Sequence, residues 1–281
     1  MDLLSAILLG IVQGVSEWLP ISSKTLDLFV FLQFLEGSES EAIPVLLFLH
    51  LGTVFAAILY FRKRILQIAS SLLKVRSIPA FLKTEASFYF FALAGTGAVG
   101  LPLLAIQSMF LPSIGTGALF AIMGLGLLAT AALLHLQKKG EGNKNLRGGE
   151  ATAEKTAEQT TIKDAILTGL FQGLSVLGGL SRSGTTTTAL VLSKFEPKAV
   201  FELSFILSIP TILCAEVLFY FLDGSFASYD IGQGATLALS SFVFGYLTID
   251  ALIRLAQRIN LASLAALFGI LMVAAGLLQL S

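Results

Sequence analysis

The chain has 281 residues, of which 55 % are hydrophobic and only 13 % are charged, and its mean hydropathy is +0.85. Soluble globular domains carry about 25 % charged residues, so this composition excludes an ordinary soluble protein and predicts an all-α polytopic membrane protein. The formal net charge is zero, which argues against nucleic acid as a partner.

The first apolar stretch is interrupted before it can cross a bilayer. Residues 1–19 contain several polar side chains and stop at a polar turn, residues 20–25, after which a second short apolar run covers residues 26–35. Each run is too short for a hydrocarbon core of roughly 30 Å, which needs about 20 residues. We therefore expect a re-entrant helical hairpin, followed by an acidic loop at residues 36–42.

Three full spans complete the first half of the chain. They cover residues 43–61, 88–106 and 114–136, and basic residues gather in the segment 62–85 between the first two spans. Because basic loops stay in the cytoplasm, this segment is expected there, and the N-terminus and residues 36–42 are expected on the outer face of the cell membrane.

The second half follows the same plan. Residues 137–161 are polar and mixed in charge, which predicts a cytoplasmic linker. Two short apolar pieces within residues 162–192 again surround a polar turn and predict a second re-entrant hairpin. Three spans follow, at residues 200–222, 231–252 and 261–280.

An internal repeat relates the two halves. Residues 6–24 align with residues 165–183, and the identical positions include both glycines and polar residues. Each half holds one hairpin and three spans, and an odd number of spans turns the second half upside down in the membrane. We therefore divide the chain into two inverted repeats, residues 1–136 and 162–281, a plan found in many transporters in which broken helices form the site.

The repeat brings two polar turns together at membrane depth. One turn covers residues 22–24 and the other covers residues 181–184; both are rich in serine, and the second also contains a glycine. A helix is expected to start at each turn and to offer free N–H groups and the positive end of its dipole. Lys24 and Arg182 add two positive charges. This chemistry predicts a phosphate or diphosphate headgroup site, with the lipid tail left in the bilayer.

Isolated ionisable residues in the apolar regions leave alternatives open. Glu17 could deprotonate a serine, ligate a metal ion, or simply pair with an arginine. Asp27 could join the site, although an i,i+3 pair with Lys24 is the simpler expectation. His50 could serve the site or be a hydrogen-bonded packing residue. Glu216 could face a cavity or reach toward the polar end of its span.

At the two turns the chain resembles the BacA-type undecaprenyl-diphosphate phosphatase family. The first motif of that family, approximately Glu-Gly-x-x-Glu-Phe-Leu-Pro-x-Ser-Ser-Thr-Gly-His, aligns with residues 13–26. Its second motif, Gln-Gly-x-x-x-x-Pro-Gly-x-Ser-Arg-Ser-Gly-x-Thr, aligns with residues 172–186, and a Phe-Ser-Phe-Leu-x-x-Ile-Pro signature resembles residues 203–210. The resemblance extends over nearly the whole chain and implies six spans plus two re-entrant hairpins in an inverted repeat.

This resemblance also implies an activity and a set of site residues. The family removes one phosphate from a polyprenyl diphosphate outside the cytoplasmic membrane, usually with a divalent cation such as Mg²⁺ or Ca²⁺, and so recycles the carrier lipid for peptidoglycan and other envelope glycans. By resemblance Ser23 is the nucleophile, Arg182 binds phosphate, and Glu17 is the base or the metal ligand. The expected substrate-binding residues are Ser22, Lys24, Gln13, Gln172, Ser181, Ser183, Gly184 and Thr186.

Two departures from the family pattern separate two functional hypotheses. The first glutamate of the family is Gln13 here, which is neutral and a poorer metal ligand, and the histidine of the family is Leu26. The retained serine, glutamate and arginine favour a hydrolase. The lost residues favour a protein that binds or translocates polyprenyl phosphate, or a related anionic lipid, without cleaving it. The sequence leaves a homodimer open.

Overall fold

The computed structural model of the chain is built from helices. It describes all residues except 74, 111–113, 147–153, 223–228, 257–258 and 280–281, with the backbone alone described at residues 39, 137–146 and 256. The described residues form no β-strand, and they include six helices long and apolar enough to cross a membrane. The prediction of an all-α polytopic membrane protein is confirmed.

The helices of the first half follow the predicted order. They are α1 (Leu3–Ser16), α2 (Ser23–Gln33), α3 (Glu39–Tyr60), α4 (Arg62–Leu72), α5 (Ile78–Phe81), α6 (Glu85–Phe110) and α7 (Thr116–Leu146). Helices α1 and α2 form the first hairpin, while α3, α6 and α7 are candidate spans. The amphipathic segment between α3 and α6 folds into two short helices, α4 and α5.

The second half repeats this order. Its elements are η2 (Ala157–Gln159), α8 (Ile162–Gly173), η3 (Leu174–Val176), α9 (Arg182–Leu192), α10 (Pro197–Leu222), α12 (Ile231–Ala256) and α13 (Leu261–Leu278). Helices α8 and α9 form the second hairpin, and α10, α12 and α13 are candidate spans.

Local chemistry explains why the helix is interrupted within each hairpin. Helix α1 ends just before Pro20, which has no N–H group to continue it, and Ser22 then adopts a left-handed conformation with φ 59° before α2 starts. In the second hairpin Gly179 has φ 88°, and a Cβ at this position would lie 1.9 Å from the Met123 carbonyl oxygen. Only glycine fits this close approach to α7.

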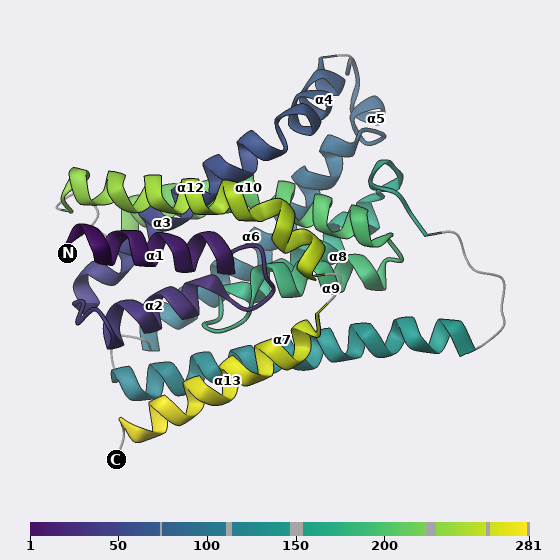
Figure 1. Cartoon of the computed structure of the whole chain (residues 1–281). Helices are drawn as coiled ribbons and strands as arrows, with labels where there is room; N and C mark the ends of the chain where they lie inside the picture. Colours follow the sequence, from purple (N-terminus) through teal and green to yellow (C-terminus); the bar gives the residue numbers. More distant parts are fainter. Residues whose placement is uncertain (74, 111–113, 147–153, 223–228, 257–258, 280–281) are drawn as a thin grey trace.

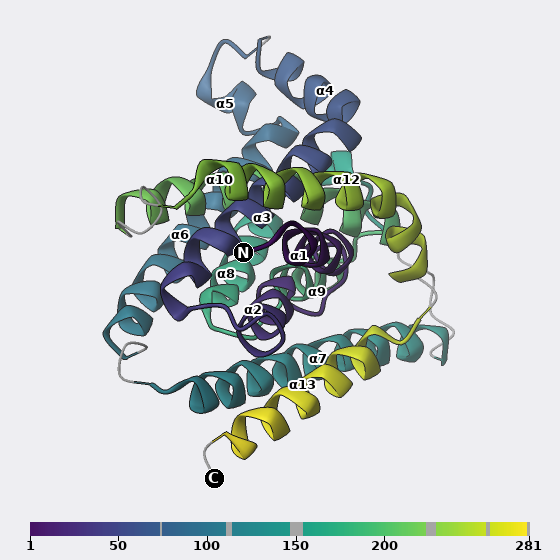
Figure 2. The same ribbon diagram turned by 60° about the vertical axis from the view of Figure 1, so that its left-hand side comes forward.

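The first helix of each hairpin packs against a span of the other half. Helix α1 of the first half packs against α12 of the second, and α8 packs against α6, while α7 pairs with α13. Both hairpin helices approach their partners through glycine: a Cβ at Gly14 would lie 2.6 Å from the Gly245 nitrogen, and one at Gly169 would lie 2.2 Å from the Ala92 oxygen. Figure 2 shows α1, α2, α8 and α9 in the middle of the molecule, with α10 and α12 on one side and α7 and α13 on the other.

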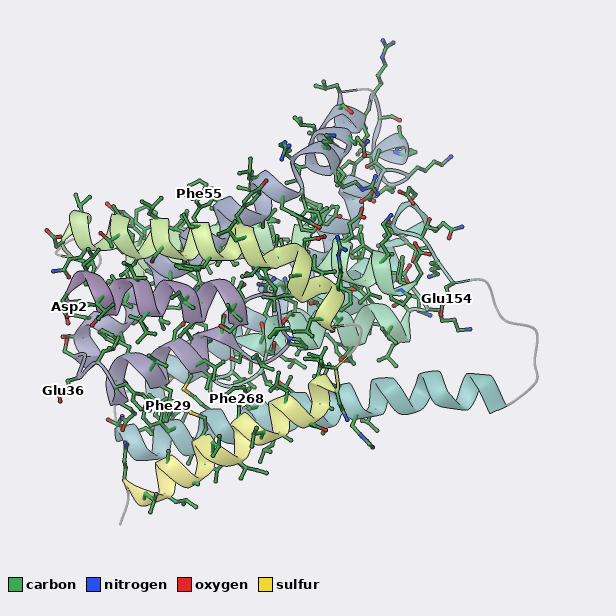
Figure 3. All side chains as sticks on the ribbon, in the orientation of Figure 1. Asp2, Phe29, Glu36, Phe55, Glu154 and Phe268 are labelled. Atoms are coloured by element: carbon green, nitrogen blue, oxygen red, sulfur yellow. The ribbon has the colours of Figure 1, made fainter. Side chains whose placement is uncertain are left out.

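The ends of the spans separate into two groups. The N-terminus and the end of α13 lie at one end of the molecule, and α4 and α5 lie at the opposite end (Figure 1). Asp2 and Glu36 share the first end, and Glu154 lies at the second (Figure 3). The acidic loop therefore lies on the same side as the N-terminus and opposite the polar linker.

The structure describes both ends of the polar linker. Helix α7 runs ten residues beyond the expected end of its span, to Leu146, whereas residues 147–153 lie outside the described part. Farther on, Lys155 donates from Nζ to Asp164 at 2.9 Å, and its backbone pairs with that of Lys194 and Glu196 at 2.9 and 3.0 Å. These contacts attach the end of the linker to α8 and to the α9–α10 connection.

Candidate functional site

Two helix N-termini meet where the hairpins touch. Helix α2 begins at Ser23, and α9 begins at Arg182. The Ser181 hydroxyl caps α9 by accepting a hydrogen bond from the Gly184 nitrogen at 3.2 Å. The Ser183 hydroxyl, on the first turn of α9, donates to the Leu19 carbonyl oxygen at 3.1 Å and so joins the two hairpins. The first N–H groups of a helix have no partner within it, so this junction can bind an anion.

Glu17 is the centre of the polar contacts. Its Oε1 atom pairs with Nη2 of Arg182, which comes from the other hairpin. Its Oε2 atom accepts hydrogen bonds from Ser23 Oγ at 2.6 Å and from Gln13 Nε2 at 3.2 Å. The Glu17 side chain is only 4 % exposed. The carboxylate therefore pairs with Arg182 and accepts a hydrogen bond from the Ser23 hydroxyl at the same time.

His50 approaches the same carboxylate from α3. Its Nε2 atom lies 3.8 Å from Glu17 Oε2, and its Nδ1 atom lies 2.7 Å from the Leu46 carbonyl oxygen. The ring is therefore hydrogen-bonded within its own helix and also lies beside the Glu17 carboxylate.

Two positively charged groups at the starts of α2 and α9 remain available. Nη1 of Arg182 is buried without a hydrogen-bond partner. Within the described part of the chain, no hydrogen bond or ion pair is formed by Lys24, at the first turn of α2. Burying a hydrogen-bond donor without a partner costs free energy. Hydrogen bonds from these groups to an anionic ligand would therefore be favourable.

Two predicted site residues point elsewhere. Gln172 donates from Nε2 to Thr96 Oγ1 at 2.9 Å and to Thr211 Oγ1 at 2.8 Å, which ties α8 to α6 and α10. The Thr186 hydroxyl lies 2.6 Å from the Ser204 hydroxyl and faces α10. Both residues support the hairpin, and neither contacts the Glu17 carboxylate.

The predicted pair between Lys24 and Asp27 is wrong. No ion pair joins them among the described residues, and both carboxylate oxygens of Asp27 are buried without a hydrogen-bond partner. The i,i+3 spacing allows such a pair but does not enforce it. Asp27 itself is fully buried.

Ser22 and Gly184 have local structural contacts. The Ser22 hydroxyl lies 2.9 Å from the Thr25 hydroxyl within the same turn. A Cβ at Gly184 would lie 2.8 Å from Thr130 Cγ2 and 3.5 Å from Pro20 Cβ, so the glycine lets α9 approach α7 and the first hairpin. Each residue shapes its turn.

Two threonines outside the motifs support the site. Thr53 accepts from Gln13 Nε2 at 3.2 Å, and Thr130 accepts from the Ser181 nitrogen at 3.1 Å. The contact of Gln13 with Thr53 corresponds to that of Gln172 with Thr211 in the second repeat. The sequence singles out neither threonine: the shift of 159 residues that aligns the hairpins places Thr53 opposite Ile212, next to Thr211.

Comparison with known proteins identifies the family. Residues 6–278 match the family model described as bacitracin resistance protein BacA. The chain belongs to the BacA family. The resemblance read from the two turn motifs is thereby confirmed.

Several curated relatives of this BacA protein carry the name undecaprenyl-diphosphatase. One from Methanococcoides burtonii is 33 % identical, with 97 % of this chain and 98 % of the relative covered. One from Haloarcula marismortui is 36 % identical, with 98 % of each chain covered. A third, from Pyrobaculum islandicum, is 35 % identical and covers all of this chain and 98 % of its own length.

Two apolar grooves flank the junction of this BacA protein. One, of about 330 Å³, lies between the first hairpin and α13 and is lined by Leu26, Phe29 and Phe268, among others. Figure 3 shows Phe29 and Phe268 between α2 and α13. The other, of about 360 Å³, lies between α7 and the second hairpin and reaches Leu180, next to the α9 N-terminus. Each hairpin thus has an apolar groove beside its polar turn.

Proposed function

We propose that this BacA protein is an integral-membrane undecaprenyl-diphosphatase. It hydrolyses the lipid diphosphate to the monophosphate and inorganic phosphate, and so recycles the carrier lipid. Family membership, the names of the relatives and the six apolar spans support this activity. The observation that carries it for this chain is the 2.6 Å hydrogen bond from Ser23 Oγ to Glu17 Oε2, at the N-termini of two helices.

In this proposal the diphosphate binds at the junction of the hairpins. Arg182 keeps one salt link to Glu17 and offers its unpartnered Nη1 to a phosphate oxygen. Lys24 and the free N–H groups at the starts of α2 and α9 complete the anion site. Donors fixed in a buried site are already oriented for the charge that develops during phosphoryl transfer, which is how such sites lower the barrier.

Ser23 is the proposed nucleophile. Its Oγ attacks the terminal phosphorus, the bond from that phosphorus to the bridging oxygen breaks, and the lipid monophosphate leaves with the electron pair. Glu17 takes the serine proton at Oε2, the atom that already accepts its hydrogen bond. Water then hydrolyses the phosphoserine, which releases inorganic phosphate and restores the serine hydroxyl.

The protein oxygens at this site can hold a divalent cation only together with the phosphates of the substrate. The described residues contain no cluster of three His, Cys, Asp or Glu side chains that would form a protein cage. Gln13 Oε1, however, is buried without a partner beside Glu17. Mg²⁺ is commonly held by one or two protein oxygens together with substrate phosphates. We assign Glu17 and Gln13 as its protein ligands, and the cation would supply charge neutralisation of the phosphates.

The groove beside α2 is proposed to hold the prenyl chain. Leu26 lies three residues after Ser23, on the same helix face, and lines this groove. A diphosphate bound at Ser23 would therefore have its apolar tail at the mouth of an apolar groove.

The proposed location is the cytoplasmic membrane, with the N-terminus and residues 36–42 on the outer face. Residues 62–85 and 137–161 would lie in the cytoplasm. Support comes from the basic residues at the start of α4 and the last turn of α12, at the end of the molecule opposite the N-terminus.

Phosphate release from undecaprenyl diphosphate tests the activity. With Mg²⁺ or Ca²⁺ present, the purified protein should release phosphate, and Ser23→Ala should lower kcat by at least about 1,000-fold, because it removes the nucleophile. Ser16→Ala is the matched control. The Ser16 hydroxyl is buried one residue before Glu17 but donates only to the Val12 carbonyl of its own helix, so this variant should keep its activity.

The opposite result would favour the non-hydrolytic hypothesis. If no phosphate is released with either cation, while the lipid still binds and Arg182→Ala abolishes binding, the hydrolase proposal fails. Headgroup accessibility in liposomes would then test translocation.

A further inference from the structure

We infer that helices α4 and α5, with the described residues that flank them, form an arm that lies on the membrane surface and binds the acidic headgroups of its phospholipids. The leaflet concerned is the one on the α4 side, which is cytoplasmic in the orientation proposed above. This surface lies outside both hairpins, so its binding of lipid does not depend on the proposed hydrolase activity.

The arm is joined to a membrane span at both ends. Helix α4 starts at Arg62, directly after the span α3 ends at Tyr60 and its cap. Helix α5 ends at Phe81, and the span α6 starts at Glu85. Figures 1 and 2 both show α4 and α5 projecting sideways beyond α10 and α12, across the direction in which the spans run. An arm that leaves the end of a span sideways lies along the surface of the bilayer.

One arginine fixes the base of the arm to the bundle. Arg64 donates from Nε to Glu202 on α10 at 2.6 Å, and from Nη2 to Glu85 on α6 at 2.6 Å and to Glu158 on η2 at 3.0 Å. Beyond this anchor, neither α4 nor α5 contains a buried residue. Most of the surface of the arm is therefore left outside the bundle.

One face of α4 is apolar and exposed. Leu66, Ala69 and Leu73 follow one another at intervals of three and four residues, which places them on the same side of the helix. Leu66 is 67 % exposed, Leu73 is 88 % exposed, and Ile78 at the start of α5 is 76 % exposed. Such a group of large apolar side chains is unfavourable in water. The bilayer, to which the arm is joined at both ends, is an apolar phase within reach of all of them.

All charged residues of the arm are basic. Residues 62–84 contain lysine and arginine but no aspartate or glutamate. Lys63, Arg76 and Lys83 are exposed, and they form no ion pair with any other residue that the structure describes. A helix with an apolar face and basic residues beside it is typical of segments that lie in the membrane interface, and anionic headgroups attract basic residues next to a span.

The charge and the apolar face fit the two parts of one acidic phospholipid. Lys63 precedes Leu66 by three residues, so the two side chains are neighbours on the helix surface. The lysine stem can lie along apolar surface while its ammonium group stays at the level of the headgroups. A lipid beside α4 would thus have its phosphate at Lys63 and its acyl chains against Leu66 and Leu73.

Quenching by nitroxide-labelled lipids tests the arm in the whole protein. The only cysteine, Cys214, is exposed and is replaced by serine, and a bimane fluorophore is attached at Leu66→Cys. The protein is placed in nanodiscs of equal parts of phosphatidylcholine and phosphatidylglycerol, with a nitroxide on the acyl chain of one lipid at a time. We expect both lipids to quench the fluorophore, and labelled phosphatidylglycerol to quench it at least about threefold more strongly, because the basic residues enrich the acidic lipid.

Gln67→Cys is the matched control for the apolar face. Gln67 is also exposed on α4, but it lies about 100° away from Leu66 around the helix axis. A fluorophore there should be quenched at most about half as strongly, because it points away from the acyl chains.

A second variant separates charge from apolar contact. In Lys63→Gln/Arg76→Gln/Lys83→Gln the fluorophore at Leu66→Cys should still be quenched, but the preference for phosphatidylglycerol should disappear. High salt should weaken the same preference in the wild type, because it screens exposed charges. Lys198→Gln is the control, since Lys198 is exposed on α10 outside the arm, and it should keep the preference. If the triple variant melts at a lower temperature, Lys63→Gln/Lys83→Gln is judged by the same preference.

Each outcome decides one part of the inference. No quenching at Leu66→Cys by either lipid, or equal quenching at Leu66→Cys and Gln67→Cys, overturns the membrane contact and favours a soluble protein as the partner of the arm. Equal quenching by the two lipids, or a preference that survives loss of the basic residues, overturns the recognition of acidic headgroups. A wild type that releases no phosphate refutes the hydrolase proposal and leaves these results unaffected.

Discussion

Arg182→Met should destabilise the protein by about 3 kcal/mol. Methionine approximates the length of arginine but carries no charge, so the change leaves Glu17 without its partner. The pair is buried, with side-chain exposures of 16 % for Arg182 and 4 % for Glu17. Removing one member of such a pair costs about 3–5 kcal/mol. Hydrogen bonds from Ser23 and Gln13 still reach the carboxylate, which argues for the lower end of this range.

Removing both charges should restore most of the loss. In Glu17→Gln/Arg182→Met neither charge of the pair remains, so the double variant should lie within about 1 kcal/mol of the wild type. The resulting coupling of about 2 kcal/mol or more is measurable by a double-mutant cycle. Arg254→Met is the control: Arg254 pairs with Asp250 at exposures of 72 % and 52 %, and surface pairs contribute about 0–1 kcal/mol.

Equilibrium unfolding in mixed micelles is the appropriate assay. A loss of 3 kcal/mol corresponds to a change of roughly 100-fold in the unfolding equilibrium constant, since about 1.4 kcal/mol corresponds to a tenfold change. The reasoning fails if Arg182→Met loses less than about 1 kcal/mol. It fails equally if the double variant is no more stable than Arg182→Met.

Two further predictions concern packing and the lipid tail. Gly52→Ala should cost about 1–3 kcal/mol, because its Cβ would lie 1.9 Å from Ser241 Oγ, whereas Gly97→Ala, with its nearest contact at 4.0 Å, should gain about 0.5–1 kcal/mol from helix propensity. Equal melting temperatures for the two variants would contradict the close approach of α3 and α12. Leu26→Trp should displace about two methylene groups of the prenyl chain from its groove, at about 0.8 kcal/mol each, and raise KM roughly tenfold. A short-chain diphosphate is the control substrate, and an equal rise in its KM would argue against tail binding in that groove.

Hydropathy predicted the helices well because a backbone inside the bilayer must satisfy its own hydrogen bonds, which a helix does. Apolar runs shorter than a span could only be re-entrant, and the polar turns that interrupt them mark the starts of α2 and α9. The C-terminal end of α7 was less predictable. Its polar continuation to Leu146 lies beyond the apolar span, and hydropathy carries no signal for a helix of that kind.

The sequence predicted only part of the site. Motif spacing singled out Ser23, Glu17 and Arg182, and the fold brings these three side chains into contact. The orientation of each side chain depends on tertiary packing, which spacing does not report. Gln172 therefore turned out to bind α6 and α10, and His50 turned out to face the carboxylate from a separate span.

One side-chain contact occurs in both halves of the chain. Gln13 bonds to Thr53, and Gln172 bonds to Thr211, in halves that run in opposite directions. A pair of identical subunits, inserted antiparallel in one membrane, would make this contact twice by symmetry, and gene duplication with fusion would preserve it. The ancestor would then have carried two equivalent half-sites. Once fused, the halves would be free to diverge, and in this chain the first half carries Ser23 and Glu17 while the second carries Arg182.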